Sequence, residues 1–507
     1  MTTPTAGVAD RAATAPERAV CRLDDRALTY RELDDGSQHI GTWLRSRNIG
    51  DGSRVATMFG NTPAAVLVWL GIERSGAIEI PLNTALTGRL LAEQLEASGP
   101  DLILAEPGYV TTVEAALAGA GLEVPLQAVA DIAEISLEGA LEPATDDTRT
   151  GLILFTSGTT GRSKGVALPH RSTMRLARGI VENVGLGATD VLYTPFPLFH
   201  IAARFVSVVA AMLCDGEVVV QRRFSASAFW DTCRRQGVTA VHYLGTIPMM
   251  LFNQPNSPSD RDHPIRVAYG AGLPPAVAAD FEARYGLRTH ELYGSTEQGM
   301  VAINREGDRR VGSCGKPVAD VDLEIHNDGD VPVPVGEWGE IVVRPRQPHL
   351  FFSGYDGMPE ATLQVWRNLW FHTGDLGRLD ESGYLYFGGR IKEAIRRRGE
   401  NISAWEVERA VSGFRGIGDV AAVGVPSPLG DEEVLVAVVA DASIDWQTLA
   451  EHCSAELPTY AVPRYFRQLT ALPRTSTGRV EKYKLVAEGV TTDTWDRSPA
   501  SEGAKHQ

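Results

Sequence analysis

Short apolar runs alternate with amphipathic helical patterns over most of the chain. Between about residues 20 and 350, runs such as VATMF, AIEIPL, EVVVQ and TAVHYL are separated by patterns such as TPAAVLVWLGIERSG and PPAVAADFEARYG. Strands of this length with helices between them are typical of βαβ units. The pattern predicts an α/β fold with a large, layered N-terminal domain and largely parallel sheets. The apolar run from Phe205 to Cys214 is too short to cross a membrane and predicts a buried helix.

The pattern of apolar and charged segments changes near residue 383. The hairpin-like GYLYFGGR is followed by the charged IKEAIRRRGENIS, a shorter alternation of apolar runs and the helical pattern WQTLAEHCSAEL. We expect a large domain over residues 1–389, a hinge at residues 390–392 and a smaller, mobile α+β domain over residues 393–507.

Composition narrows the class of protein. The 507 residues are 43% hydrophobic and 22% charged, which is ordinary for a packed globular protein and excludes a disordered or fibrous chain. The formal net charge of −16 argues against broad binding to nucleic acid or anionic lipid, so an anionic ligand needs local cations. Five scattered cysteines support neither a disulfide framework nor a zinc site. Since we find no secretory leader and no membrane span, we expect a cytoplasmic protein.

The stretch LILFTSGTTGRSKGVALPH, residues 152–170, carries the strongest chemical signal. We interpret it as a buried strand that leads through a polar loop to the start of a helix. Gly158 and Gly161 let backbone N–H groups approach an anion, and Lys164 supplies a positive charge. Hydroxyl groups come from Thr156, Ser157, Thr159 and Thr160. The loop predicts phosphate binding but is not a Walker A motif, because two residues separate Gly161 from Lys164. The alternative is a flexible polar linker.

This loop resembles the phosphate-binding signature of the acyl-adenylate-forming enzymes, which include acyl-CoA ligases, nonribosomal adenylation domains and luciferases. Further motifs similar to those of the family follow in order: LYGSTEQG at 292–299, WFHTGDLG at 370–377, GRIKEAIRRRGENIS at 389–403 and LPRTSTGRVEKYKL at 472–485. The resemblance covers nearly the whole chain, and within the family the sequence is most similar to the crotonobetaine/carnitine-CoA ligase-like branch. It implies the family's two-domain fold and an enzyme that joins a small or medium carboxylic acid first to AMP and then to CoA.

The resemblance implies binding sites for ATP and Mg²⁺. In the family a carboxylate attacks the α-phosphate of ATP, releases pyrophosphate and forms an acyl-AMP. Residues 156–161 and Lys164 would hold the β- and γ-phosphates, Thr296 would bond the α-phosphate, and Glu297 would hold Mg²⁺. A glutamate after a threonine is otherwise usually a solvated surface residue.

The rest of the nucleotide would be held by residues of three motifs. By resemblance, Asp375 would accept hydrogen bonds from the ribose hydroxyls, and Arg390 would add a donor. The adenine would lie between a wall of small residues and an aromatic ring. Together with their neighbours, these residues are Gly270, Ala271, Gly272, Tyr293, Gly294 and Ser295. The alternative for the small residues is a plain turn between a strand and a helix.

His200 matches the family's aromatic or histidine position near the acyl site. A lone histidine in an apolar segment is otherwise more often a core residue with both ring nitrogens satisfied. Further candidates for the acyl pocket are His242, Tyr243, Thr246 and Met300. This mixture of aromatic, thioether and polar groups indicates a modest acid and not a long acyl chain.

Lys392 stands at the family's hinge position, about which the small domain would rotate after adenylation. The neighbouring Arg396, Arg397 and Arg398 would then meet the nucleotide phosphates of CoA. The alternative for these three arginines is a solvated basic turn.

The last motif departs from the family pattern. Where the family has a lysine after Thr-Gly, this chain has Arg479, whose planar fork is bulkier and presents its donors differently. We do not treat Lys482 as a replacement. Arg479 leaves three interpretations: an ordinary ligase tuned to its acid, a loss of efficient adenylation, or activation of an unusual anion, as in relatives that use ATP to activate nitrite and diazotise an aromatic amine. Loading of a carrier protein instead of CoA, and a nucleotide-binding protein without turnover, are the remaining alternatives.

Overall fold

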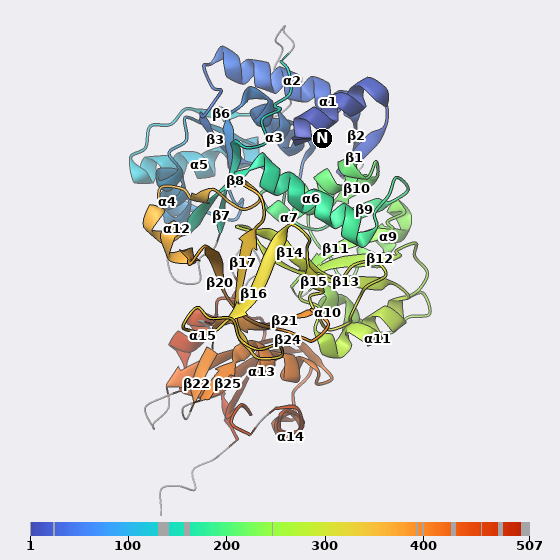
Figure 1. Cartoon of the computed structure of the whole chain (residues 1–507), viewed down its shortest axis with the longest axis vertical. Helices are drawn as coiled ribbons and strands as arrows, with labels where there is room; N and C mark the ends of the chain where they lie inside the picture. Colours follow the sequence, from blue (N-terminus) through green and yellow to red (C-terminus); the bar gives the residue numbers. More distant parts are fainter. Residues whose placement is uncertain are drawn as a thin grey trace, which may run out of the picture.

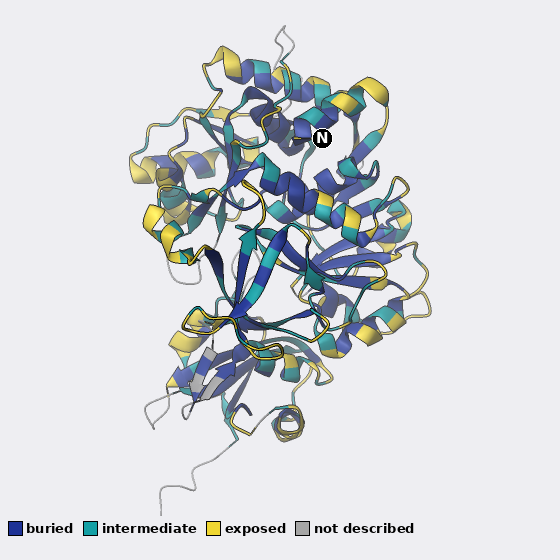
Figure 2. Ribbon diagram, viewed as in Figure 1, coloured by how far each residue is buried: buried dark blue, intermediate teal, exposed yellow. Residues whose placement is uncertain are grey.

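The computed structural model describes residues 2–23, 26–129, 141–156, 163–245, 247–391, 394–397, 400–426, 432–457, 459–474 and 480–497. A large N-terminal part carries two mixed sheets, an antiparallel sheet and most of the helices, and a smaller C-terminal part lies at one end of it (Figure 1). Buried residues concentrate in the sheets and in the helices packed between them (Figure 2).

The first large sheet has seven strands in the order β18-β8-β7-β4-β3-β5-β6. Its strands from β7 to β6 are parallel, whereas β8 and β18 run antiparallel to their neighbours. The strands are β3 (Arg54–Met58), β4 (Ile78–Pro81), β5 (Leu102–Ala105), β6 (Leu126–Ala128), β7 (Thr150–Thr156), β8 (Lys164–Pro169) and β18 (Gly354–Tyr355). The helices that precede or connect these strands are α1 (Pro4–Thr14), α2 (Tyr30–Ser46), α3 (Pro63–Ser75), α4 (Gly88–Ser98) and α5 (Pro107–Ala120).

The second large sheet has nine strands in the order β15-β14-β13-β12-β11-β9-β10-β1-β2. Its interior is parallel, and the strands β2, β14 and β15 are antiparallel at the edges. The strands are β1 (Ala19–Leu23), β2 (Arg26–Thr29), β9 (Val191–Thr194), β10 (Glu217–Val220), β11 (Ala240–Leu244), β12 (Val267–Ala271), β13 (Arg288–Ser295), β14 (Gly299–Ile303) and β15 (Lys316–Pro317). Its helices include α6 (His170–Val184), α9 (Phe229–Gln236), α10 (Ile247–Phe252) and α11 (Pro275–Tyr285).

The expected buried helix over Phe205 to Cys214 is present, and its residues up to Val209 form a π-helix, which is wider than an α-helix. It begins as α7 (Ile201–Ala203), continues as the π-helical segment η2 (Arg204–Val209) and ends as α8 (Ala210–Leu213). All residues of η2 are buried.

A third sheet in the large part is antiparallel throughout, which the sequence pattern did not predict. It contains β16 (Val321–His326), β17 (Gly339–Pro345), β19 (Trp366–Arg367), β20 (Trp370–Leu379) and β21 (Leu385–Arg390), with α12 (Pro359–Val365) before β19. The two-residue turn between β19 and β20 places Asn368 and Leu369 at φ 50° and 64°.

The C-terminal part builds its own core on a four-stranded sheet in the order β24-β25-β26-β27, beside the hairpin β22–β23. The elements are β22 (Ala394–Arg397), β23 (Glu400–Ser403), α13 (Ala404–Ser412), β24 (Ile417–Pro426), β25 (Glu432–Ala440), α14 (Trp446–Glu456), β26 (Tyr465–Leu469), α15 (Lys482–Glu488) and β27 (Trp495–Asp496). It contacts the large part through Ser403, whose hydroxyl donates to the carbonyl of Gly388, and through Ile417, whose carbonyl accepts from Asn253 at 3.1 Å.

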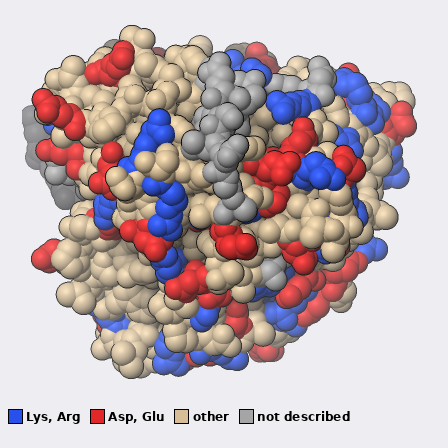
Figure 3. Space-filling model, turned by 90° about the horizontal axis from the view of Figure 1, so that it is seen from above, with Lys and Arg blue, Asp and Glu red and all other residues tan. Residues whose placement is uncertain are grey.

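All five cysteines are free thiols. Four are buried, and burial raises the pKa of Cys21 to about 12 and that of Cys214 to about 11. No helix within the described ranges is long and apolar enough to cross a lipid bilayer. On the face drawn in Figure 3, basic side chains are interspersed with acidic ones, so an anion at that face would meet local cations and not a broad basic field.

Candidate active site

The predicted phosphate loop joins two antiparallel strands. Thr156 ends β7 and faces Lys164 at the start of β8, and the Thr156 hydroxyl lies 3.5 Å from the Lys164 carbonyl oxygen. The loop residues Ser157, Gly158, Thr159, Thr160 and Gly161 lie outside the described residues. Our expectation that a helix follows the loop is wrong: GVALP extends β8, which pairs with both β7 and β18, and α6 begins only at His170.

Lys164 and Glu297 both contact Tyr355. The Lys164 ammonium is 4.6 Å from the centre of the Tyr355 ring, and the Tyr355 hydroxyl donates to Glu297 Oε1 at 3.1 Å. Ser295 donates its hydroxyl to Glu297 Oε2 at 2.7 Å, and the half-buried Thr296 lies between these two residues in the turn after β13. Sequence reasoning missed Tyr355, because no motif contains it. The arrangement presents one cation and one carboxylate together, which suits a phosphate chain and a hard metal ion.

The described residues contain no group of three or more histidine, cysteine, aspartate or glutamate side chains that could hold a metal ion. Glu297 would therefore be joined by at most one further side chain of this kind among the described residues. That number fits Mg²⁺, which proteins commonly bind through one or two carboxylates while substrate phosphates and water complete the octahedron.

The motifs YGSTE and TGD meet at a buried carboxylate. The hydroxyl of Tyr293 donates to Asp375 Oδ2 at 2.6 Å, and Arg390 Nε lies 2.8 Å from Asp375 Oδ1. Asp375 and Arg390 are direct partners on β20 and β21, and Arg390 also donates to the carbonyl of Thr373 at 3.0 Å. Burial, followed by the charge of Asp375, raises the pKa of Tyr293 well above its usual value, so the phenol stays protonated as the donor.

The small-residue segment at the end of β12 approaches neighbouring backbone closely. A Cβ at Gly270 would lie 1.8 Å from the carbonyl oxygen of Tyr243, so only glycine fits there. Glu291, which sequence reasoning also missed, accepts from the backbone N–H groups of Gly272 at 3.1 Å and Leu273 at 2.9 Å and from the Tyr243 hydroxyl at 2.7 Å. Burial raises the pKa of Glu291 to about 7. A carboxyl group two residues before Tyr293 thus anchors this segment.

The structure separates the residues proposed for the acyl pocket. His242 and Tyr243 are neighbours on β11 and point to opposite faces of the sheet. His242 stacks on Tyr269 at 5.3 Å between ring centres, and burial lowers the pKa of His242 to about 3. Met300 packs with its terminal methyl against Gly179 of α6. His242 and Tyr243 therefore do not line the same pocket, and the acyl role of Met300 stays a prediction.

His200 is more exposed than the other acyl candidates that the structure describes. It is half-buried at the residue before α7, and its ring lies 4.7 Å from the ring of Phe199. Thr246 lies outside the described residues. The acyl role of His200 stays a prediction.

Two family models match the chain. The family described as AMP-binding enzyme matches residues 8–355, and the family described as AMP-binding enzyme C-terminal domain matches residues 406–479. The chain belongs to the AMP-binding enzyme family.

Relatives of known activity and structure match nearly the whole chain. Sulfoacetate–CoA ligase of Cupriavidus necator is 33% identical over 94% of this chain and 96% of its own length. Crotonobetaine/carnitine–CoA ligase of Salmonella agona is 31% identical over 91% and 93%. ATP-bound MatB from Rhodopseudomonas palustris superposes with a TM-score of 0.86 at 26% identity, covering 96% of this chain and 98% of that one. The expected fold and activity are confirmed: the protein is an ATP-dependent, AMP-forming acyl-CoA ligase.

In this AMP-binding enzyme, Arg397 is not a surface cation. Its Nε lies 2.6 Å from Glu433 Oε2, and its guanidinium donates to the carbonyls of Tyr460 at 2.8 Å and Val462 at 3.0 Å. Our expectation that Arg397 meets CoA is wrong, because the alternation of β22 turns this side chain into the small domain.

Other predicted residues of the hinge and small domain are not described. They are Lys392, Arg398, Arg479 and the side chain of Arg396. Lys482 begins α15 and pairs with Glu408 at 2.9 Å.

Proposed function

We propose that this ligase activates a small or medium carboxylic acid at the Lys164–Tyr355–Glu297 cluster and then passes the acyl group to CoA. The observation that carries this proposal is the contact of one tyrosine with both a cation and a carboxylate. Lys164 would offset the charge of the β- and γ-phosphates, so that pyrophosphate leaves as the acid attacks the α-phosphate. Glu297 would hold Mg²⁺, which when bound would neutralise phosphate charge during adenylation.

The nucleoside would be held by the Asp375 pair. One oxygen of Asp375 accepts from Tyr293 and the other faces Arg390, so the carboxylate is already oriented before a ribose hydroxyl binds. Gly270 and Gly272, which pack closely against the backbone of Tyr243 and Gly245, would form the wall against adenine, as the family resemblance implies.

The acid would approach from the side of His200. Two relatives with whole-length similarity act, by their names, on sulfoacetate and on crotonobetaine or carnitine, which are small polar acids. The half-buried His200 and its neighbour Phe199 suit an acid of that size. After adenylation, the small domain would rotate at Lys392 to admit CoA. The five free thiols support a reducing compartment, such as the cytoplasm.

Pyrophosphate release from Mg-ATP tests the proposal. We would measure it with sulfoacetate, crotonobetaine, carnitine and simple aliphatic and aromatic acids, each with and without CoA, and with nitrite plus an aromatic amine. Sustained release that needs both an acid and CoA supports the proposal. Release that follows nitrite and ignores CoA would contradict it and indicate the activation of a different anion. Release with an acid but without any effect of CoA would contradict the second step.

A further inference from the structure

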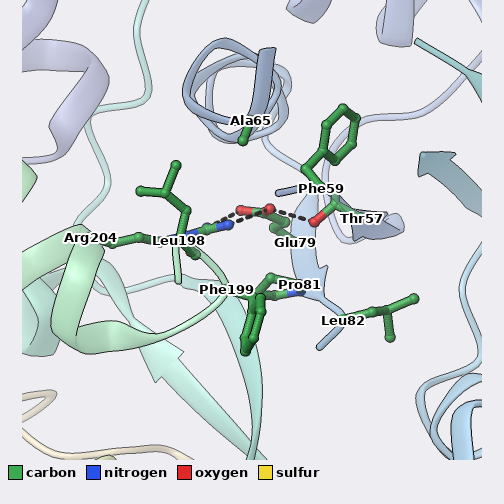
Figure 4. Close-up of a pocket in the computed structure, with 9 residues that line it drawn as sticks. All are labelled: Thr57, Phe59, Ala65, Glu79, Pro81, Leu82, Leu198, Phe199 and Arg204. Atoms are coloured by element: carbon green, nitrogen blue, oxygen red, sulfur yellow. Dashed lines mark hydrogen bonds and ion pairs between the residues drawn. The ribbon is translucent and has the colours of Figure 1, made fainter. Parts of the chain in front are cut away.

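A buried ion pair lies beside the segment that carries His200 (Figure 4). The side chains of Glu79 and Arg204 are only 2% and 4% exposed. The guanidinium faces both carboxylate oxygens, with Nη2 at 2.8 Å from Oε1, and it lies 4.9 Å from the centre of the Trp69 ring. Glu79 Oε1 also accepts from the Thr57 hydroxyl at 2.7 Å. Both charges are therefore paired and hydrogen-bonded away from solvent.

Arg204 of this pair binds the backbone two residues before His200. Arg204 Nε donates to the carbonyl of Leu198. From the opposite direction, the Leu198 N–H donates to Asn61 Oδ1 at 2.7 Å, and Asn61 Nδ2 donates to the carbonyl of Phe196 at 2.9 Å. Both polar groups of one peptide residue are thus held by buried side chains from other elements. A small pocket borders the pair, and Phe199 forms part of its wall (Figure 4).

Stability alone is a poor reason for this pair. Replacing a buried ion pair by apolar residues of similar volume is often neutral or stabilising, because the pair must overcome the desolvation of two charges. Glu79 stands on β4 of the seven-stranded sheet, whereas Arg204 begins the π-helical segment η2, packed on the nine-stranded sheet. The pair therefore ties the two sheets together where the helix widens, and π-helical turns occur frequently at functional sites.

We propose that Glu79 and Arg204 are positioning residues that hold the segment Leu198 to His200 in the orientation that the acid requires. This inference rests on the proposed function, in which His200 faces the acyl site. Neither residue of the pair touches the substrate: Arg204 acts through the Leu198 carbonyl, and Glu79 acts by fixing the guanidinium.

The test replaces the pair by apolar residues and measures the KM for the acid separately from the KM for ATP. The variant combines Glu79→Leu, Arg204→Met and Thr57→Val, so that the hydroxyl partner is removed together with the charges. We expect the KM for the acid, with sulfoacetate and crotonobetaine as the first probes, to rise by about tenfold to a hundredfold, while the KM for ATP and the melting temperature stay close to wild type. Hydrogen exchange of the peptide over residues 196–204 should become faster in the ligand-free protein.

Two matched variants keep the outcomes distinct. The buried Arg74 pairs with the half-buried Asp34 and joins α3 to α2, away from Leu198, so Arg74→Met with Asp34→Asn should leave the KM for the acid unchanged. An unchanged acid KM or unchanged exchange in the triple variant overturns the inference, and so does an equal rise of both KM values. His200→Ala tests the proposed function itself: if it leaves the acid KM unchanged, the acyl assignment of His200 fails, whereas an effect in His200→Ala but not in the triple variant refutes the positioning role alone.

Discussion

Tyr293 and Asp375, 82 residues apart in the chain, share a hydrogen bond of 2.6 Å between the phenol hydroxyl and Oδ2. The bond joins β13 of the nine-stranded sheet to β20 of the antiparallel sheet. Because Arg390 faces the other carboxylate oxygen, Asp375 is held from two sides in a buried position. These two contacts fix the orientation of the carboxylate.

Asp375→Asn should raise the KM for ATP by about tenfold or more, since hydrogen bonds to charged groups contribute about 1.5–3 kcal/mol. The amide keeps the size of the side chain but removes the charge that faces Arg390. Pyrophosphate release at varied ATP concentration measures the effect. Tyr293→Phe is the matched control: it keeps the ring and the Asp375 charge, so its KM for ATP should rise less. Equal KM values for Asp375→Asn and wild type would refute the ribose assignment.

Glu297→Gln should lower the rate of pyrophosphate release by about a hundredfold or more, because the amide is a weaker ligand for a hard cation. The Mg²⁺ concentration that gives half the maximal rate should rise as well. Tyr355→Phe removes the hydrogen bond to Glu297 while keeping the ring beside Lys164, and it should have a smaller effect on both quantities. A Glu297→Gln variant with an unchanged Mg²⁺ dependence would remove the metal assignment.

The stability of the large domain should depend on pH through Glu291. Its pKa is raised from 4.5 to about 7 in the folded protein, so the folded state binds more protons than the unfolded state between these values. The stabilisation from this group is complete below about pH 4.5 and is lost as the pH rises through 7. The melting temperature of the wild type should therefore fall relative to that of Glu291→Gln when the pH rises from 5 to 7.5, about the two ends of this range. The variant has no charge to bury and should show no such fall. Glu114→Gln, at an exposed position on α5, should show no such difference.

Leu369→Gly should stabilise the large domain by about 1 kcal/mol, because a side chain at positive φ costs about 1–2 kcal/mol. The turn at Asn368 and Leu369 has the two positive φ values for which Asn-Gly is preferred, and Leu369 is 79% exposed, so little packing is lost. Thermal unfolding measures the change. Leu369→Ala retains a Cβ at the same φ and should not raise the melting temperature; an equal gain in both variants would show that backbone strain is not the cause.

The family, fold class and activity could be predicted from the sequence because each motif keeps its residues close together in the chain. The family pattern assigned Tyr293 to the adenine and Asp375 to the ribose, but it did not predict the hydrogen bond between them. The contact of Tyr355 with Lys164 and Glu297 did not, because it depends on β18 pairing with β8 across a distance that no local pattern records. The pair Glu79 and Arg204 escaped prediction for the same reason.

Two errors had a signal that could have prevented them. Neighbouring residues of a strand alternate between faces, so His242 and Tyr243 could not share one side of β11. The same alternation within AIRR indicates that one arginine of the basic run points into the small domain, as Arg397 does. The helix expected after the phosphate loop was wrong because GVALP is short and apolar, a pattern that does not distinguish a buried strand from a helix. The domain limits and the role of Arg479 stay predictions.

The burial of the cysteines has a practical consequence for studying turnover. Only the thiolate form of a cysteine reacts rapidly with disulfide reagents, and burial raises the pKa of all five thiols, with Cys453 at about 12. Free CoA carries an accessible thiol. A chromogenic thiol reagent should therefore report the disappearance of CoA against a low background from the enzyme, even when the enzyme is present in amounts comparable to its substrate.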